Sequence, residues 1–199
     1  MSVMILWRHA RTEYNADGRL QGALDIPLGE GGRAQAASAA RRLVERYGAD
    51  LTIVSSPLSR ALDTADELAA LTGGDVAADP GLTQRPYGAW EGLTWADVQA
   101  RWPEEFEARK RGEDPDIPGW GMSAEVGERV GAALRDHWDP DAVTVVVSHG
   151  SAIQLGLLNV LELDPLSKAF GSVPHAAWHE VRRVESGAWH IDALGLGAD

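Results

Sequence analysis

Short apolar runs alternate along the chain with stretches in which apolar residues recur every three or four positions. The runs predict buried strands, because a strand covered on both faces shows no polar alternation. They span residues 3–7, 51–54 and 143–147. The stripes at helical spacing predict helices over residues 32–47, 58–69, 126–138 and 152–161. Two further stretches, 177–184 and 189–194, flank a turn and predict a hairpin.

This order of elements predicts an α/β fold in three layers. Strands that alternate with helices form a mostly parallel central sheet with helices on both faces, here followed by a C-terminal hairpin. The sequence contains no internal repeat, low-complexity tract or linker that would divide it. We therefore expect one domain over residues 1–199.

Residues 78–122 interrupt the alternation. They contain five prolines, four of the eight tryptophans and a charged run from Glu104 to Asp116. Helices are expected near residues 95–102 and 104–111. We interpret the rest as an excursion over the sheet. Its tryptophans either mark an exposed interaction patch or cover the sheet, and the second outcome is the commoner one. Long excursions in compact domains are usually functional or disordered, so this segment is a candidate cap over a binding site.

Composition narrows the classes of function. The chain has 30 acidic and 18 basic residues and a formal charge of −12, which argues against a nucleic-acid partner or an anionic membrane surface. The absence of cysteine excludes disulfides, thiolate metal sites and thiol nucleophiles. No apolar run approaches the roughly 20 residues that span a bilayer. The N-terminal run is too short for a signal peptide, so we expect a cytoplasmic protein.

Arginine and histidine side chains follow three predicted strands. The first strand leads into Arg8 and His9, the second leads to Arg60, and the third leads into His149. Ligands of such folds bind at the carboxyl ends of the strands, so these side chains are expected to meet. Two guanidinium groups would hold a compact anion such as phosphate, and imidazole is a nucleophile that needs no metal. Singly, each residue is more often structural or a surface charge, so only the set indicates a site.

A series of motifs resembles the histidine phosphatase superfamily, the phosphoglycerate-mutase-like proteins. The family signature Arg-His-Gly-x-Thr, with Asn three positions after the Thr, is similar to the segment from Arg8 to Asn15. Within this superfamily, the chain is similar to actinobacterial glucosyl-3-phosphoglycerate phosphatases, notably across residues 8–43. The other similar segments, in the family's order and spacing, are Leu20–Gly22, Asp25–Leu28, Gly32, Ser55–Ala61, Tyr87–Gly92 and Ser148–Gly150.

The resemblance implies a role for each matching residue. His9 would be the nucleophile that becomes phosphohistidine, while Arg8, Arg60 and His149 would bind the phosphoryl oxygens. The resemblance implies substrate or phosphate binding by Asn15, Gln21, Gly22, Arg85, Tyr87 and Gly150. The implied activity is that of a metal-independent phosphomonoesterase for small phosphorylated metabolites, of the sugar phosphate or phosphoglycerate type. This activity needs no cofactor. The resemblance leaves open whether the protein forms a homodimer.

Three positions depart from the family pattern. Ala10 stands where the signature has Gly, which would restrict the backbone if that position needs an unusual φ. Gln84 stands at the general-acid position, where the family has the Glu that protonates the leaving oxygen. Positioned acid catalysis contributes about 10²–10⁴-fold to the rate. Met122, in Gly121-Met122-Ser123, stands at the Glu of the usual Gly-Glu-Ser, so a second carboxylate of the family's pocket is missing.

These departures leave three explanations open. The protein is a specialised phosphatase whose leaving groups need little protonation, or one that uses a neighbouring acid such as Glu13 or Glu91. Alternatively, it is a weakened member that binds phosphate without turning it over. In the third explanation, Gln84 is an introduced replacement of the catalytic Glu.

A cofactor-dependent phosphoglycerate mutase is the alternative activity. Residues 84–87 resemble the mutase stretch Glu-Arg-His-Tyr, and Arg109–Arg111 lies where mutases carry basic residues for the phosphoglycerate carboxylate. The same basic cluster also fits a solvated helix face paired with nearby glutamates. Mutases carry a longer insertion that shields the phosphoenzyme from water. Here only residues 112–120 separate the basic cluster from Gly121. Such a short cover should leave the phosphoenzyme accessible to water, which favours hydrolysis.

His175 and His179 have the four-residue spacing that binds metal on a helix. No helix is predicted there, because Pro174 precedes a strand-like segment, and the sequence offers no third ligand nearby. We therefore expect no metal site.

Overall fold

The computed structural model describes residues 2–197, and its centre is a six-stranded sheet with the order β3-β2-β4-β1-β5-β6. The strands are β1 (Val3–Arg8), β2 (Thr52–Ser55), β3 (Val76–Ala78), β4 (Val143–Ser148), β5 (Trp178–Arg183) and β6 (Trp189–Leu196). The first four run parallel to one another, whereas β5 and β6 pair antiparallel. The mostly parallel sheet with a C-terminal hairpin is therefore confirmed.

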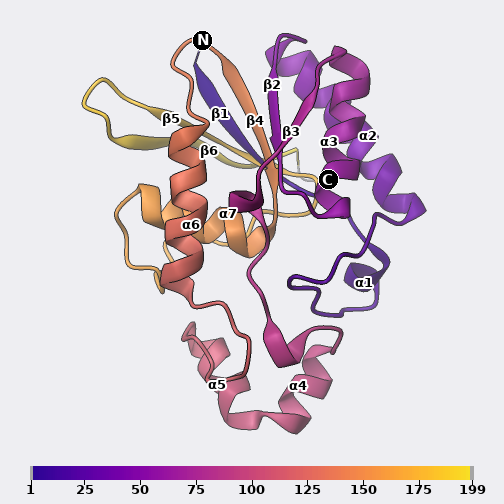
Figure 1. Ribbon diagram of the computed structural model, residues 1–199, viewed down its shortest axis with the longest axis vertical. Helices are drawn as coiled ribbons and strands as arrows, with labels where there is room; N and C mark the ends of the chain where they lie inside the picture. Colours follow the sequence, from indigo (N-terminus) through magenta and orange to yellow (C-terminus); the bar gives the residue numbers. More distant parts are fainter. Residues whose placement is uncertain (1, 198–199) are drawn as a thin grey trace.

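Four helices form the two outer layers (Figure 1). On one face of the sheet lie α2 (Glu30–Tyr47) and α3 (Ser59–Thr72), and on the other lie α6 (Ser123–Asp136) and α7 (Gly150–Val160). Each helix buries one stripe of its surface against the strands, as its apolar spacing predicts. The predicted three-layer arrangement is confirmed.

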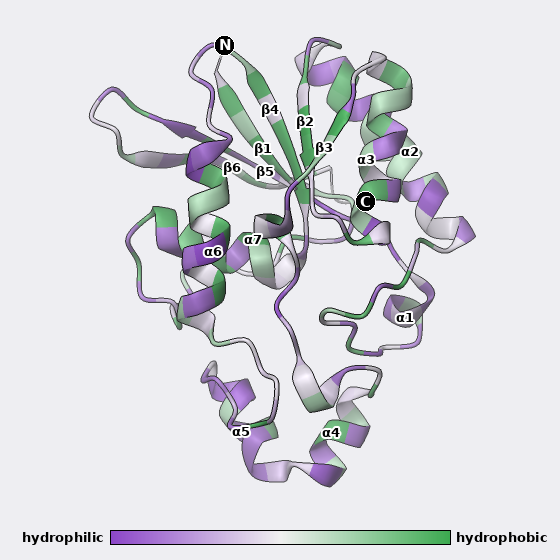
Figure 2. Ribbon diagram, in the orientation of Figure 1, coloured by the Kyte–Doolittle hydropathy of each residue, from purple (hydrophilic) through white to green (hydrophobic). Residues whose placement is uncertain are grey.

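Side-chain alternation along the strands divides the core into two halves. In β1, Val3, Ile5 and Trp7 pack with α2 and α3, whereas Met4 and Leu6 pack with α6 and α7. All five side chains are buried. In Figure 2 the parallel strands are mostly green, the hydrophobic colour, whereas the helices carry both green and purple residues. Both faces of the parallel strands are therefore covered.

The sequence pattern did not predict the shortest elements. β3 has three residues and is partly exposed, so it carries no apolar run. The helix α1 (Glu13–Ala16) has four residues and begins with a capping box between Thr12 and Asn15. Two turns of 3₁₀ helix, η1 (Pro80–Leu82) and η2 (Gly88–Trp90), lie in the excursion. Elements of three or four residues are too short to show a periodicity.

The prediction that the excursion lies over the sheet is wrong. Its helices α4 (Trp95–Arg101) and α5 (Pro103–Arg111) lie beyond the carboxyl ends of the strands, at the bottom of Figure 1. Its tryptophans pack on one another, and the buried rings of Trp90 and Trp120 have centroids 5.3 Å apart. This third apolar cluster also contains Leu20, Val98 and Ile117. The excursion thus has a small core of its own.

Residues 2–197 contain no helix that is both long and apolar enough to cross a membrane. In the same residues, no group of three or more His, Asp or Glu side chains is placed to hold a metal ion.

Candidate active site

The register of the sheet brings the two candidate histidines together. β1 and β4 are parallel neighbours with Arg8 opposite Ser148, and a histidine follows each strand. The backbone N–H of His9 donates to the carbonyl oxygen of Ser148 at 2.9 Å. The rings of His9 and His149 are buried, with centroids 5.1 Å apart. Two strand ends therefore place two imidazoles in contact.

Arg60 reaches the same place from the first turn of α3. Its buried guanidinium donates to the carbonyl oxygens of Leu24 at 2.7 Å and Gly22 at 2.9 Å. Its Nε donates to Nδ1 of His149 at 3.3 Å. Burial lowers the pKa of Arg60 to about 10, so the group remains a cation at neutral pH.

Arg8, at the end of β1, is a second cation, and its side chain is half-buried. Its guanidinium donates to the carbonyl oxygen of Val173 at 2.7 Å and to Nε2 of His175 at 2.9 Å. Burial lowers the pKa of Arg8 to about 10. Its Nε is buried and has no hydrogen-bond partner among residues 2–197. A buried donor without a partner is unfavourable, and a bound anion would supply the missing acceptor.

A cavity of about 280 Å³ opens beside these groups, and we call it the His9 cavity. Eight of the eleven candidate residues line it: Arg8, His9, Asn15, Gln21, Gly22, Arg60, Gln84 and Tyr87. Arg19 and Trp95 also line it, although the sequence did not mark them. None of the described lining residues is Asp or Glu. The cavity is therefore positively charged and suits a compact anion.

The hydrogen bonds of His9 define its protonation. Nδ1 lies 2.7 Å from the carbonyl oxygen of Ala10, which can only accept, so Nδ1 carries the proton and Nε2 keeps its lone pair. Burial holds the pKa of His9 well below its ordinary value, and His149, Arg60 and Arg8 lower it further. The ring is neutral at pH 7, and Nε2 is available as a nucleophile.

His149 adjoins the His9 cavity without lining it. Its Nδ1 accepts from Arg60, so Nε2 carries the proton and donates to the hydroxyl oxygen of Ser56 at 2.9 Å. Burial, reinforced by the charge of Arg60, holds the pKa of His149 well below its ordinary value. Both ring nitrogens are thus engaged within the protein and help to hold Arg60. The phosphoryl contact implied for His149 stays a prediction.

His175 is a site residue whose role sequence reasoning missed. Its Nε2 accepts from Arg8, and its Nδ1 lies 3.2 Å from the carbonyl oxygen of His9. Burial, with the charge of Arg8, lowers the pKa of His175 to about 3, so the ring is neutral. His179 is separate, because its Nδ1 accepts from the backbone of Gly195 in the hairpin. The four-residue spacing therefore reflects two unrelated contacts, and His175 positions Arg8 and the backbone of His9.

Asn15, Gln21 and Gly22 form the part of the wall contributed by the segment after β1. The hydroxyl of Thr12 lies 3.1 Å from Oδ1 of Asn15 and 2.9 Å from Oε1 of Gln21, which orients both amides. Gly22 has a φ of +54°, and a Cβ there would overlap Glu91. Only glycine fits at this position.

Gly150, the remaining glycine candidate, does not line the His9 cavity. A Cβ added there would lie 3.1 Å from Cζ of Arg8 and 2.6 Å from Oγ of Ser172. Gly150 therefore leaves the space that the Arg8 guanidinium occupies, and its implied part in binding is indirect in this geometry.

Two departures from the family pattern do not affect the cavity. The non-glycine residues with positive φ in the described chain are Glu162 and Ala176, so Ala10 needs no unusual backbone. The condition under which Ala10 would restrict the backbone is therefore not met, and its methyl group packs in the core beside α2 and α3. Met122 precedes α6, is largely exposed and does not line the cavity.

Gln84 is different, because it lies in the cavity wall. Its Oε1 accepts the backbone N–H of Arg85 at 2.9 Å. Of the neighbouring acids suggested by the sequence, Glu13 is exposed on α1, and Glu91 accepts two backbone N–H groups. Neither lines the His9 cavity. Among residues 2–197, no carboxyl group therefore lines the site to protonate a leaving oxygen.

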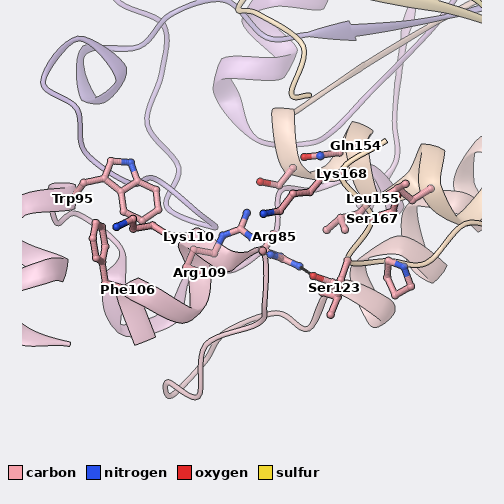
Figure 3. Close-up of a pocket in the computed structure, with 15 residues that line it drawn as sticks. Arg85, Trp95, Phe106, Arg109, Lys110, Ser123, Gln154, Leu155, Ser167 and Lys168 are labelled. Carbon is pink, nitrogen blue, oxygen red and sulfur yellow. Dashed lines mark hydrogen bonds between the residues drawn. The ribbon is translucent and has the colours of Figure 1, made fainter. Parts of the chain in front are cut away.

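A second cavity, of about 520 Å³, adjoins the first, and we call it the α5 cavity. Trp95 lines both, and the hydroxyl of Tyr87 in the first lies 2.8 Å from Oγ of Ser151 in the second. Side chains of α7 and α5 supply apolar contacts. Figure 3 shows the cations that reach in from opposite sides, Arg109 and Lys110 on α5 and Lys168 after α7.

Arg85 lines the α5 cavity and not the His9 cavity. It is 1% exposed, forms an ion pair with Asp114 at 3.2 Å and donates to the hydroxyl of Ser123. Burial lowers the pKa of Arg85, and the charge of Asp114 opposes that shift. The resemblance implies that Arg85 binds substrate or phosphate; the structure puts its side chain in the wall of the adjoining α5 cavity, and the implied contact stays a prediction.

The basic cluster on α5 fits both interpretations that the sequence left open. Arg109 and Lys110 line the α5 cavity, although Lys110 also pairs with Glu107 at 2.8 Å. Arg111 is exposed and pairs with Glu113 at 2.7 Å. Two of the three side chains therefore face a cavity, and the third belongs to a solvated helix face.

Comparisons with known proteins identify the family. The model of the histidine phosphatase superfamily (branch 1) matches residues 4–196. Glucosyl-3-phosphoglycerate phosphatase of Mycobacterium tuberculosis is 34% identical over 98% of this chain and 95% of its own length. Phosphoserine phosphatase 1 of Hydrogenobacter thermophilus is 36% identical over 84% of this chain and 80% of its own. The solved structure of mycobacterial glucosyl-3-phosphoglycerate phosphatase with VO3 has a TM-score of 0.86 and 33% identity, covering 98% of this chain and 99% of that one. The chain belongs to the histidine phosphatase superfamily and is an enzyme of the phosphatase class.

Proposed function

We propose that the protein is a metal-independent phosphatase that hydrolyses small phosphorylated metabolites through a phosphohistidine on His9. The observation that carries this proposal is the free Nε2 of a neutral, buried imidazole in a cavity bordered by Arg8 and Arg60. The names of the relatives, a glucosyl-3-phosphoglycerate phosphatase and a phosphoserine phosphatase, support this class of substrate.

The reaction is a double displacement. Nε2 of His9 attacks phosphorus, the bond to the leaving oxygen breaks, and the alcohol departs with one added proton. Water then attacks the phosphohistidine, gives up a proton, and the phosphorus–nitrogen bond breaks to release inorganic phosphate and neutral imidazole. In both steps Arg8 and Arg60 offset the charge on the equatorial oxygens, and their positions are held in advance by protein acceptors.

Hydrolysis is proposed over transfer to a second metabolite because the cover of the site is short. Residues 112–120 are the whole segment between α5 and Gly121, and Trp95 at the His9 cavity is 44% exposed. Water can therefore reach the phosphoenzyme.

The test is a panel of phosphorylated metabolites, together with p-nitrophenyl phosphate, assayed for inorganic phosphate. Release from at least one metabolite is expected. Failure to release phosphate from any of them contradicts the proposal, and transfer to an added glycerate acceptor without release favours the mutase alternative.

The α5 cavity supports a substrate whose leaving group carries a second negative charge. Arg109 and Lys168 approach this cavity from different elements, and neither forms an ion pair with another residue of the described range 2–197. A carboxylate or phosphate at the far end of the leaving group would meet both cations while the rest of the leaving group contacts the apolar wall.

Lys168→Gln is expected to raise KM for an acidic ester such as 3-phosphoglycerate by about two- to fivefold, the range for one exposed ion pair. KM for p-nitrophenyl phosphate, which lacks the second charge, should change by less. Steady-state kinetics on both esters measure the difference. Arg111→Gln is the matched control, because Arg111 pairs with Glu113 and does not line the cavity. Equal changes in KM for the two esters would contradict this assignment.

Treatment with EDTA is expected to leave the activity unchanged. The phosphoryl group has two guanidinium groups to offset its charge, and none of the described residues lining the His9 cavity is a carboxylate that would hold a hard cation. Initial rates before and after chelation measure this. A loss that a divalent ion restores would show that the mechanism needs metal.

A further inference from the structure

None of the described residues that line the His9 cavity is a carboxylic acid, although expulsion of an alkoxide requires a proton. Five of the described residues that line it carry titratable side chains: Arg8, His9, Arg19, Arg60 and Tyr87. His9 forms the bond to phosphorus, and guanidinium groups remain charged at neutral pH. The phenol of Tyr87 is therefore the lining group that is left to supply a proton.

Given the proposed function, we propose that Tyr87 is the general acid of this enzyme and protonates the leaving oxygen in the place of Gln84. The amide of Gln84 has no proton to transfer, and its Oε1 is already bound by the backbone of Arg85. The role thus moves three residues along the same loop, to a side chain that lines the same cavity.

Three contacts fix Tyr87 for this role. Its backbone N–H donates to Oε1 of Glu91 at 2.9 Å, and its ring stacks on Trp120 with centroids 5.4 Å apart. Its hydroxyl lies 2.8 Å from Oγ of Ser151. When Ser151 donates in this hydrogen bond, the O–H of Tyr87 is free for the leaving oxygen. The ring, backbone and hydroxyl are therefore all oriented before substrate binds.

The surrounding cations suit the product of that proton transfer. Arg8 and Arg60 line the same cavity as Tyr87, and none of the described lining residues is Asp or Glu. Opposite charges attract, so these guanidinium groups offset the negative charge that proton transfer leaves on the phenolic oxygen.

The two halves of the reaction balance around this group. In the first, Nε2 of His9 bonds to phosphorus while the bond from phosphorus to the leaving oxygen breaks, and that oxygen takes the Tyr87 proton. In the second, the Tyr87 phenolate removes a proton from the attacking water as the phosphorus–nitrogen bond breaks. Tyr87 returns to the phenol, so no further reactant is needed.

The test is Tyr87→Phe, measured as kcat/KM for glycerol phosphate and for p-nitrophenyl phosphate. This ratio reports only the steps up to release of the alcohol. The alkyl ester should lose about 10²–10⁴-fold, the contribution of a positioned acid. The aryl ester leaves readily as an anion and should lose less than about tenfold. Equal losses on both esters, or no loss on the alkyl ester, would overturn the proposal.

Tyr47→Phe is the matched control, because it also removes a phenolic hydroxyl. The hydroxyl of Tyr47 is hydrogen-bonded to Glu180 and Trp178 and lies outside the cavity. Both esters should react as in the wild type. Circular dichroism checks folding, and if Tyr87→Phe does not fold, Ser151→Ala tests the same split between esters by removing the partner of the hydroxyl. A wild-type enzyme that releases phosphate from neither ester counts against the proposed function itself. A wild type active on both, with no split in the variants, counts against Tyr87 alone.

Discussion

His9→Ala is expected to lower kcat by at least about 10⁴-fold on every substrate, aryl and alkyl esters alike, because it removes the atom that bonds to phosphorus. Leaving-group quality cannot rescue this variant, which distinguishes loss of the nucleophile from loss of an acid. The same change should abolish incorporation of phosphate into the protein. Brief incubation with a radiolabelled phosphate ester, followed by acid and alkaline quenching, measures the acid-labile adduct typical of phosphohistidine.

The control for this experiment is His190→Ala, an exposed histidine of the hairpin that contacts Asp192. It should retain both turnover and the adduct. Wild-type rates in His9→Ala, or an adduct of unchanged stoichiometry, would show that another group is the nucleophile. An inactive wild type that still binds inorganic phosphate would instead favour the weakened, phosphate-binding alternative.

The sequence predicts the positions of His9 and His149 well, because in a parallel sheet each position depends only on the strand that directly precedes the histidine. Each histidine follows a buried strand, and β1 and β4 pair in a register that puts Arg8 opposite Ser148. Once the apolar runs are interpreted as parallel strands, their carboxyl ends have to meet. Arg60 is predictable on the same grounds, since it follows β2 closely on the chain.

His175 could not be predicted in the same way, because its contacts depend on a loop that returns to β1 from more than 160 residues away. The loop is held there by the indole of Trp7, which donates to the carbonyl oxygen of Ala176, a residue with a positive φ. Neither the approach nor the backbone conformation has a periodic signal. The meeting of Lys168 with α5 is equally non-local.

The position of the excursion failed for a related reason. Its tryptophans were expected to cover the sheet, since apolar side chains usually pack on the largest available core. Instead Trp90 and Trp120 pack with Val98 and form a separate apolar cluster beyond the strand ends. Hydrophobicity indicates that these residues are buried, but it does not tell which surface they are buried against.

Gln84→Glu is expected to install a second acid in the cavity wall. One carboxyl oxygen can still accept the N–H of Arg85, which leaves the other for the leaving oxygen. The new carboxyl has to be protonated to act, so its benefit should fade as the pH rises through its pKa. A neighbouring phosphate dianion raises that pKa, which extends the benefit toward neutral pH. For an alkyl ester the gain can reach about 10²–10⁴-fold, and an aryl ester should gain far less.

Comparing Gln84→Glu in the wild type with Gln84→Glu in Tyr87→Phe tests whether Tyr87 and the new carboxyl group protonate the same leaving oxygen. In Tyr87→Phe no other lining acid remains, so Gln84→Glu should restore most of the alkyl activity that the first change removed. In the wild type Tyr87 already protonates the leaving oxygen, so the gain should be smaller. The four proteins form a double-mutant cycle, in which residues acting on one proton give strongly non-additive effects. Equal gains in both backgrounds would mean that the two side chains act independently, and no gain in either would mean that position 84 does not face the leaving oxygen.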